Sequence, residues 1–481
     1  MQGPNPRFEP TNGHHWFDGS GMIHYVRLRG AGNSAEYGCR FVKTRGFEEE
    51  QAAGKRVHVS LTKPPKAASI LRGMVAKGAH WRAPDSPYWV IQSANNANNG
   101  VKFHAGRLLA TYEAGSAYEV ELGRQMRTLG VCSFGGSWGP YDHWTENFSA
   151  HAKLCSVTGE LVYIGYNLVP FQGPPTVTVG VVSPAGAVAH RVTVPVSRPS
   201  MQHDFGITST RTVLLDGPLV FNLDKSIAGG RPFDFQRGEP LRFGILPRYG
   251  APADCVWIDA ECGFAYHVVN CWDDPGDADR VVVILCRMRE TRALGMADSV
   301  QRHPNGQVGV SQEGPEAGPF VEEGFLHRYV LDVQARRVVE SAPLCAIPSD
   351  FPCVHPARVG RPTRFAYAAG ERSGTHDSIT MFDALLKHDL ASGDLVRRPL
   401  PQGTLCGDVA FAPATPRGPV PVSDDDGHVL LLTHVLAEDR AELLVLDGRD
   451  ILAPPVAVVH IPVRVPFGFH CEWVAGPLSD W

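Results

Sequence analysis

The sequence has no run of apolar residues that approaches the length of a membrane span, and no secretory signal peptide is visible at its start. It also lacks any C-x-x-C pair, because its 11 cysteines are scattered along the chain. An odd, unpatterned set of this kind indicates free thiols. It argues against a disulfide framework and against a zinc site made of cysteines. We therefore expect an intracellular protein in a reducing compartment.

Neither sign of charge is in marked excess. The chain has 45 basic and 50 acidic residues, which are interspersed, and a formal net charge of −5. This balance excludes a strongly basic face, so we expect no nucleic-acid partner. The alternation of strands and helices that marks Rossmann and TIM-barrel folds is also missing. No Ser-His-Asp or Cys-His signature for nucleophilic catalysis is visible either.

Glycine (50) and proline (39) are abundant, but 43% of the residues are hydrophobic, so the chain is turn-rich and not disordered. A first hairpin is predicted over residues 22–43. Four later segments repeat the pattern of strand, polar turn and strand: 152–166, 327–339, 387–397 and 442–460. Irregularly spaced antiparallel hairpins over the whole length predict an all-β fold, and a β-propeller more than a sandwich.

A chain of 481 residues exceeds a typical single domain, but propellers run this long as one unit. We therefore expect one propeller domain over residues 1–481. A four-stranded blade takes about 40–50 residues, so seven blades would leave a large surplus for long loops on one face.

Residues 63–79 differ from the surrounding sequence, because apolar side chains recur there at helical spacing with basic residues around them. The apolar positions are Ile70, Leu71, Met74 and Val75, and Lys66, Arg72 and Lys77 are the basic ones. One interpretation is a helix packed on the domain. The other is a membrane-surface contact through residues 66–77.

Four histidines lie in or beside short apolar or aromatic runs that are typical of strand ends: His151, His203, His267 and His470. Imidazole is the commonest metal ligand near neutral pH, because it binds as the neutral ring. Iron(II) suits imidazole and an octahedral shell, so four such ligands would leave two open positions. The intervals of 52, 64 and 203 residues are too long for a local motif. They are explained if each histidine comes from a different blade and points at the propeller axis.

The residues around these histidines resemble the motifs of the carotenoid cleavage oxygenases, a family that includes lignostilbene dioxygenases and the retinal isomerase. The family pattern A-H-P-K corresponds here to Ala150-His151-Ala152-Lys153, and M-M-H-D-F corresponds to Met201-Gln202-His203-Asp204-Phe205. The pattern F-x-F-H-x-x-N-A-W corresponds to Phe264-Ala265-Tyr266-His267-Val268-Val269-Asn270-Cys271-Trp272. The pattern V-P-Y-G-F-H corresponds to Val465-Pro466-Phe467-Gly468-Phe469-His470. Near the start, Gly3-Pro4-Asn5-Pro6 and His15-Trp16-Phe17-Asp18-Gly19-Ser20-Gly21-Met22-Ile23-His24 are similar to two further motifs. The likeness covers nearly the whole chain.

The resemblance implies a seven-bladed propeller with a loop or helical cap over an apolar tunnel. It implies iron(II), Fe(2+), held by His151, His203, His267 and His470. It also implies a second shell of three glutamates that accept hydrogen bonds from ligand imidazoles and fix their tautomers.

Glu113 matches the first of these glutamates, whereas Asp350 and Asp408 stand where the other two are usual. Aspartate keeps the charge but is shorter by one methylene. Contact with an imidazole would then need a backbone shift or a bridging water. Taken without the resemblance, these aspartates are equally well interpreted as turn residues.

Family members usually carry a segment before the Gly-Pro-Asn-Pro motif, so we expect that the N-terminus given is truncated or that the ring is less well closed. A plastid location would follow from a missing leader. Otherwise we expect a cytoplasmic or membrane-peripheral protein.

The activity implied is cleavage of one carbon–carbon double bond of a carotenoid or apocarotenoid by dioxygen, giving two carbonyl products. A stilbene-cleaving dioxygenase, a retinoid isomerase and a non-catalytic binding propeller are the alternatives. Stilbene-type members usually have a lysine that engages the substrate phenol, and residues 135–144 lack it.

Overall fold

The computed structural model describes residues 1–8, 17–29, 34–58, 95–113, 115–123, 125–136, 148–168, 173–227, 232–291, 299–302, 308–311, 323–371, 382–415 and 423–476. The basic amphipathic segment 63–79 and residues 137–147 lie outside these ranges. Within them the chain is nearly all β, as the sequence predicts. Helix is limited to α1 (Arg45–Ala53), α3 (Leu223–Ile227) and 3₁₀ turns at Pro252–Asp254, Pro356–Arg358 and Leu436–Glu438.

The first half of the chain forms small antiparallel sheets in sequence order. The first contains β1 (Gln2–Asn5), β2 (Ser20–Arg29) and β3 (Ser34–Phe41). The second contains β4 (Gly100–His104), β5 (Arg107–Thr111), β6 (Tyr118–Val120) and β7 (Thr128–Val131). The third contains β8 (Lys153–Leu154), β9 (Leu161–Tyr166), β10 (Thr176–Val182) and β11 (Val188–Pro195). The fourth contains β12 (Gly206–Ile207), β13 (Arg211–Asp216), β16 (Leu241–Pro247) and β17 (Val256–Ala260).

The second half continues this pattern. A fifth sheet contains β18 (Val268–Asp273), β19 (Arg280–Met288), β22 (Gly324–Asp332) and β23 (Arg337–Pro343). The last sheet begins with β24 (Ser349–Cys353), β25 (Phe365–Glu371), β26 (Phe382–Asp389) and β27 (Leu395–Pro399). It continues through β28 (Thr404–Pro413), β29 (Gly427–Val435), β30 (Arg440–Asp447) and β31 (Ala457–Ile461). Two short pairs stand apart: β14 (Leu219–Phe221) with β15 (Phe233–Phe235), and β20 (Ser299–Arg302) with β21 (Val308–Ser311).

All five hairpins predicted from turn signals are present, as the pairs β2–β3, β8–β9, β22–β23, β26–β27 and β30–β31. The turns at Gly159 and Gly393 have φ values of 71° and 82°, which glycine adopts without strain.

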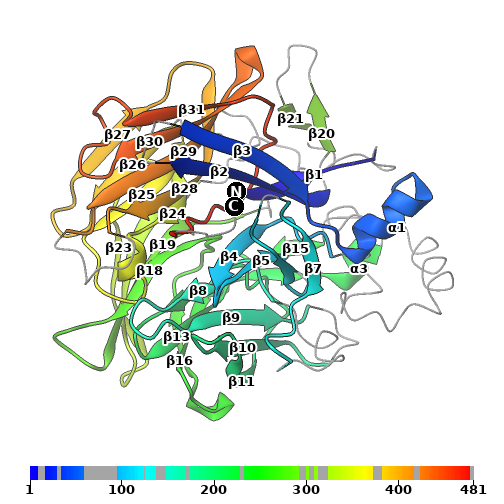
Figure 1. Cartoon of the computed structure of the whole chain (residues 1–481). Coiled ribbons are helices and arrows are strands. Elements are labelled where there is room, and N and C mark those ends of the chain that lie inside the picture. The colour runs from blue at the N-terminus through cyan, green and yellow to red at the C-terminus, as the bar shows by residue number, and fades with distance from the viewer. Residues whose placement is uncertain are drawn as a thin grey trace.

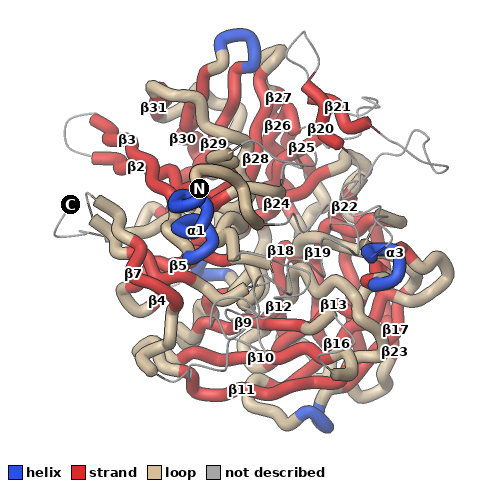
Figure 2. Tube along the Cα trace, turned by 90° about the vertical axis from the view of Figure 1, so that its right-hand side faces the viewer, coloured by secondary structure: helices blue, strands red, loops and turns tan. Residues whose placement is uncertain are grey.

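The sheets are arranged around a common centre, where β1 lies (Figure 1). A bridge joins Gln2 in β1 to His470. A view turned by 90° shows strands throughout, with helix in only a few short pieces (Figure 2). Among the described residues, no helix combines the length and apolar character needed to cross a membrane.

The core lies between neighbouring sheets. In β9, Leu161 and Tyr163 pack toward the second sheet, while Val162, Ile164 and Tyr166 pack toward the fourth. Both faces of this strand are therefore buried, which explains its continuous apolar sequence. Outer strands such as β11 alternate between buried and exposed side chains instead.

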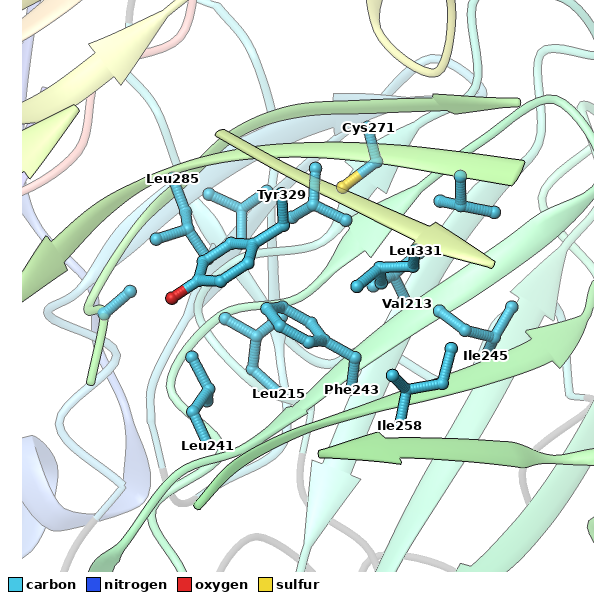
Figure 3. Close-up of a cluster of buried hydrophobic side chains, with 14 residues drawn as sticks. Val213, Leu215, Leu241, Phe243, Ile245, Ile258, Cys271, Leu285, Tyr329 and Leu331 are labelled. Atoms are coloured by element: carbon cyan, nitrogen blue, oxygen red, sulfur yellow. The ribbon is translucent and has the colours of Figure 1, made fainter. Parts of the chain in front are cut away.

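One of these layers, between the fourth and fifth sheets, is drawn in Figure 3. The rings of Phe243 and Tyr329 meet there with centroids 5.0 Å apart, and Leu285 lies in the same cluster (Figure 3). All three side chains are fully buried.

Replacing Leu285 with alanine should lower the free energy of unfolding by about 2–5 kcal/mol, because it leaves a cavity in this layer. Leu452→Ala is the control, since Leu452 is 58% exposed and should change stability by less than about 0.5 kcal/mol. Urea denaturation of the two variants checks the prediction. Equal stabilities would contradict the packing described.

Candidate metal centre

The four histidines singled out in the sequence lie together. One ring nitrogen of each is within 4.8 Å of those of the other three. His151, His203 and His267 come shortly before β8, β12 and β18, the first strands of three successive sheets. His470 follows β31 and is held by the bridge to Gln2 in β1. Each residue therefore reaches the site at the start of an inner strand or at the joined ends of the chain.

The imidazole rings meet edge to face. The ring centroid of His151 lies 4.3 Å from the centroid of His470, 4.6 Å from that of His203 and 4.9 Å from that of His267. The interplanar angles are 61–76°. The Nε2 atoms of His151 and His203 are 3.0 Å apart. In this arrangement ring nitrogens point at one another across a small space.

Carboxylates face the Nδ1 atoms of three of these rings. Glu113 Oε2 lies 3.1 Å from Nδ1 of His203, and Asp350 Oδ1 lies 2.7 Å from Nδ1 of His267. Asp408 Oδ2 is farther from Nδ1 of His470, at 3.6 Å. Tyr166 donates a hydrogen bond from its hydroxyl to the other oxygen of Glu113 at 2.5 Å. A carboxylate that accepts Nδ1–H leaves Nε2 with its lone pair free to bind a metal ion.

The two aspartates behave differently. Asp350 sits at a break in the β24–β25 register, and the next residue, Phe351, has a φ of 50°. This irregular backbone brings the short side chain into direct contact with His267. Asp408 also lies at a register break, between β28 and β29, but its Oδ2 accepts a hydrogen bond at 2.6 Å from the backbone N–H of Cys471. It therefore holds the backbone next to His470 more closely than the ring.

A partly buried ion pair connects the histidine segments. Lys153 Nζ lies 2.8 Å from Oδ1 of Asp204, whose side chain is 1% exposed. Asp204 Oδ2 accepts a hydrogen bond at 2.8 Å from the backbone N–H of Val268. One carboxylate thus connects the residues next to His151, His203 and His267. We did not single out Lys153 and Asp204 from the sequence, although both stand inside the histidine motifs.

Burial and mutual repulsion set the protonation of the rings. Burial, then the nearby rings of His470, His203 and His267, hold the pKa of His151 well below its usual value. Burial also lowers the pKa of His470, against the opposing effect of Asp408. For His267 burial acts in the same direction, but the carboxylates of Asp350, Asp204 and Asp408 together outweigh it, so the pKa of His267 is raised. His151 and His470 are thus kept neutral at physiological pH, in the form that binds metals.

These donors fit a divalent metal ion. Imidazole nitrogens bind such ions at about 2.0–2.1 Å, which places ligand nitrogens about 3–4.2 Å from one another around an octahedral ion. The observed spacing lies close to this range. In addition, the buried Nε2 of His267 has no hydrogen-bond partner among the described residues, and a buried polar atom of this kind calls for a ligand.

Aromatic side chains enclose one side of the centre. The ring of Tyr266 packs edge-on against His203, with centroids 5.4 Å apart. Tyr266 belongs to a buried cluster of apolar and aromatic side chains with Tyr112, Met201, Leu219, Phe221, Phe233, Phe264 and Met288. An apolar molecule would be stabilised on this side of the histidines.

Comparison with known proteins gives a consistent match over almost the entire chain. The family model of the retinal pigment epithelial membrane protein matches residues 2–475. The carotenoid 9,10(9',10')-cleavage dioxygenase 1 of Pisum sativum is 30% identical over 98% of this chain and 83% of its own length. A chloroplastic 9-cis-epoxycarotenoid dioxygenase of Arabidopsis thaliana is 28% identical over 98% of this chain and 75% of its own length.

Solved structures share the fold. A variant of the Synechocystis apocarotenoid oxygenase superposes with a TM-score of 0.80 at 24% identity, covering 99% of this chain and 91% of that one. The lignostilbene dioxygenase of Pseudomonas brassicacearum gives a TM-score of 0.78 at 24% identity with the same coverage. Together, the family model and these relatives show that the chain belongs to the carotenoid cleavage oxygenase family, a family of dioxygenases.

Proposed function

We propose that this protein is a non-haem iron(II) dioxygenase that cleaves one carbon–carbon double bond of a carotenoid or apocarotenoid to two carbonyl products. The observation that carries the proposal is the convergence of four buried or partly buried imidazoles, three of them facing carboxylates, beside an apolar aromatic cluster. The names of the plant relatives support the substrate class.

His151, His203, His267 and His470 would hold the ion, each through one ring nitrogen. Iron(II) accepts four imidazoles and keeps two further positions, and when bound it supplies the activation of dioxygen. Glu113 and Asp350 would fix the tautomers of His203 and His267. Asp408 would do the same for His470 more weakly, because its oxygen is 3.6 Å from the ring.

The apolar cluster beside His203 would orient the substrate. A polyene has no polar groups along its chain, so its position depends on shape and on apolar contact. Holding one double bond at a fixed place next to the histidines would select the bond that is cleaved. Tyr266, Phe264 and Met201 are the cluster members that flank the ligand residues in sequence.

We also propose that residues 1–481 form one seven-bladed propeller with a cap over a tunnel. The first three blades would be β1–β3, β4–β7 and β8–β11. The fourth would be the sheet of β12, β13, β16 and β17, and the fifth the sheet of β18, β19, β22 and β23. The last two would be β24–β27 and β28–β31. The last two are joined by a single residue pair, Phe382 with Cys406, which supports their separation into two blades.

A stilbene-cleaving activity is the competing proposal within the family. The lignostilbene dioxygenase superposes almost as well as the apocarotenoid oxygenase, so the fold does not separate the two. The absence of a lysine in residues 135–144 favours the carotenoid substrate. Aldehydes formed from a panel of carotenoids, apocarotenoids and stilbenes would distinguish these activities.

The remaining partners are proposals as well. Dioxygen is the second substrate, and a membrane contact through residues 66–77 would give access to a water-insoluble carotenoid.

All 11 cysteines are free, which supports a reducing compartment. A plastid is one such compartment, and some plant relatives are chloroplastic.

His203→Ala should lower bound iron and abolish cleavage, because the ion loses one of its four nitrogen ligands; alanine at any of the other three should do the same. Metal analysis of the purified protein and product analysis with an apocarotenoid check this. His460→Ala is the control, since it removes an imidazole that is 69% exposed and lies outside the cluster. Full iron content and activity in His203→Ala would refute the assignment.

Asp350→Asn should weaken iron binding by about 10–100-fold, because it replaces the charged acceptor 2.7 Å from His267 with a neutral amide that holds the ring less strongly. Asp408→Asn should have a smaller effect, since its contact with His470 is longer. Asp408→Glu, which extends the carboxylate toward the ring, should bind iron at least as tightly as the parent protein. Competition with a chelator gives the affinities, and the opposite ranking of the two asparagine variants would contradict the roles assigned.

A further inference from the structure

A cavity of about 500 Å³ adjoins the four-histidine centre. His151, His267 and His470 line its inner end, whereas His203 is not part of its wall. Its wall also contains Lys102 and Glu472, whose ammonium and carboxylate groups form an ion pair at 2.6 Å. These two side chains are 23% and 17% exposed, so solvent reaches this part of the wall.

Charged groups occur along this wall. Three carboxylates, from Asp204, Asp408 and Glu472, line the cavity together with two ammonium groups, from Lys102 and Lys153. The charged lining is therefore negative by one unit, and apolar side chains complete the wall. A negative, water-accessible cleft raises the local concentration of cations and speeds their entry.

The other side of the centre has a different character. His203 packs there against Tyr266, a member of the buried apolar cluster, and no residue of that cluster lines the cavity. Moving a hydrated divalent ion through such apolar surroundings would cost a large desolvation free energy. The side that suits an apolar substrate is thus unsuited to the metal ion.

We propose that the 500 Å³ cavity is the route by which a hydrated divalent cation reaches and leaves the four histidines. The inference rests on the proposed function, because it takes the histidines to be metal ligands. The ion enters beside Lys102 and Glu472, passes the carboxylates of Asp204 and Asp408, and reaches His151, His267 and His470 from the side that carries these charged groups. The apolar side then remains available for the organic substrate.

The backbone that follows His470 borders this route. Cys471 is fixed by its hydrogen bond to Asp408, and the next residue, Glu472, is fixed by Lys102 on β4. Trp473 lines both this cavity and a neighbouring one of about 460 Å³. The ion pair thus holds a charge of each sign at the outer end, where one attracts the entering cation and the other repels it.

The test uses the two halves of this ion pair. Lys102→Met removes the repelling charge and should speed the uptake of Co²⁺ by the metal-free protein, whereas Glu472→Gln removes the attracting charge and should slow it. Each change should be about threefold at low ionic strength and should shrink as salt is added. Both variants break the same ion pair, so a purely structural effect would shift both rates in the same direction.

Glu121→Gln is the matched control, since Glu121 also pairs with a basic side chain, Arg127 at 2.8 Å, but lies on the exposed surface outside the cavity wall. Its uptake rate should equal that of the parent protein. The final metal content and the thermal midpoint should be unchanged in all three variants, which shows that each is folded and that the site is intact.

The outcomes separate the two proposals. Opposite, salt-dependent shifts at a full final metal content support the route. If the variants take up metal fully but their uptake rates shift in the same direction or not at all, the proposed route is wrong. The proposed function is then unaffected. A parent protein that takes up no divalent metal overturns both.

Discussion

Four imidazole rings meeting at one buried point form the arrangement on which the rest of this structure depends. Imidazole rings at such short distances repel one another when they are protonated, and they lose hydration when they are neutral. They therefore stay together only if the surrounding residues orient each ring. Carboxylates that face three Nδ1 atoms, the ion pair of Lys153 with Asp204 and two irregular strands surround the rings and limit their orientation. The metal centre is therefore a property of several sheets at once, and no local segment contains it.

Much of this arrangement could be predicted from the sequence, because its signals are local. Turns such as those at Gly159 and Gly393 mark hairpins through their glycines, and the structure has them where expected. The four histidines were identified from their flanking residues. Strands such as β9 gave a weaker signal, because burial on both faces removes the alternation that usually marks a strand.

The rest depends on distances that side-chain identity does not determine. Asp350 and Asp408 look equivalent in the sequence, yet one contacts its imidazole at 2.7 Å and the other lies at 3.6 Å. Both aspartates also accept a backbone N–H, but Asp350 accepts it from the adjacent Phe351, whereas Asp408 accepts it from Cys471, the residue after its histidine. Asp204 likewise joins three segments that are far apart in the chain, and only the folded structure brings them together.

The bridge between Gln2 and His470 has a consequence for how the protein folds. It joins residues from opposite ends of the chain, and contacts of such high sequence separation form late because loop closure must come first. The fourth histidine therefore arrives only when the two ends have met. An ion that needs all four imidazoles would bind only the molecule in which this bridge has formed, so its binding free energy would stabilise the bridge.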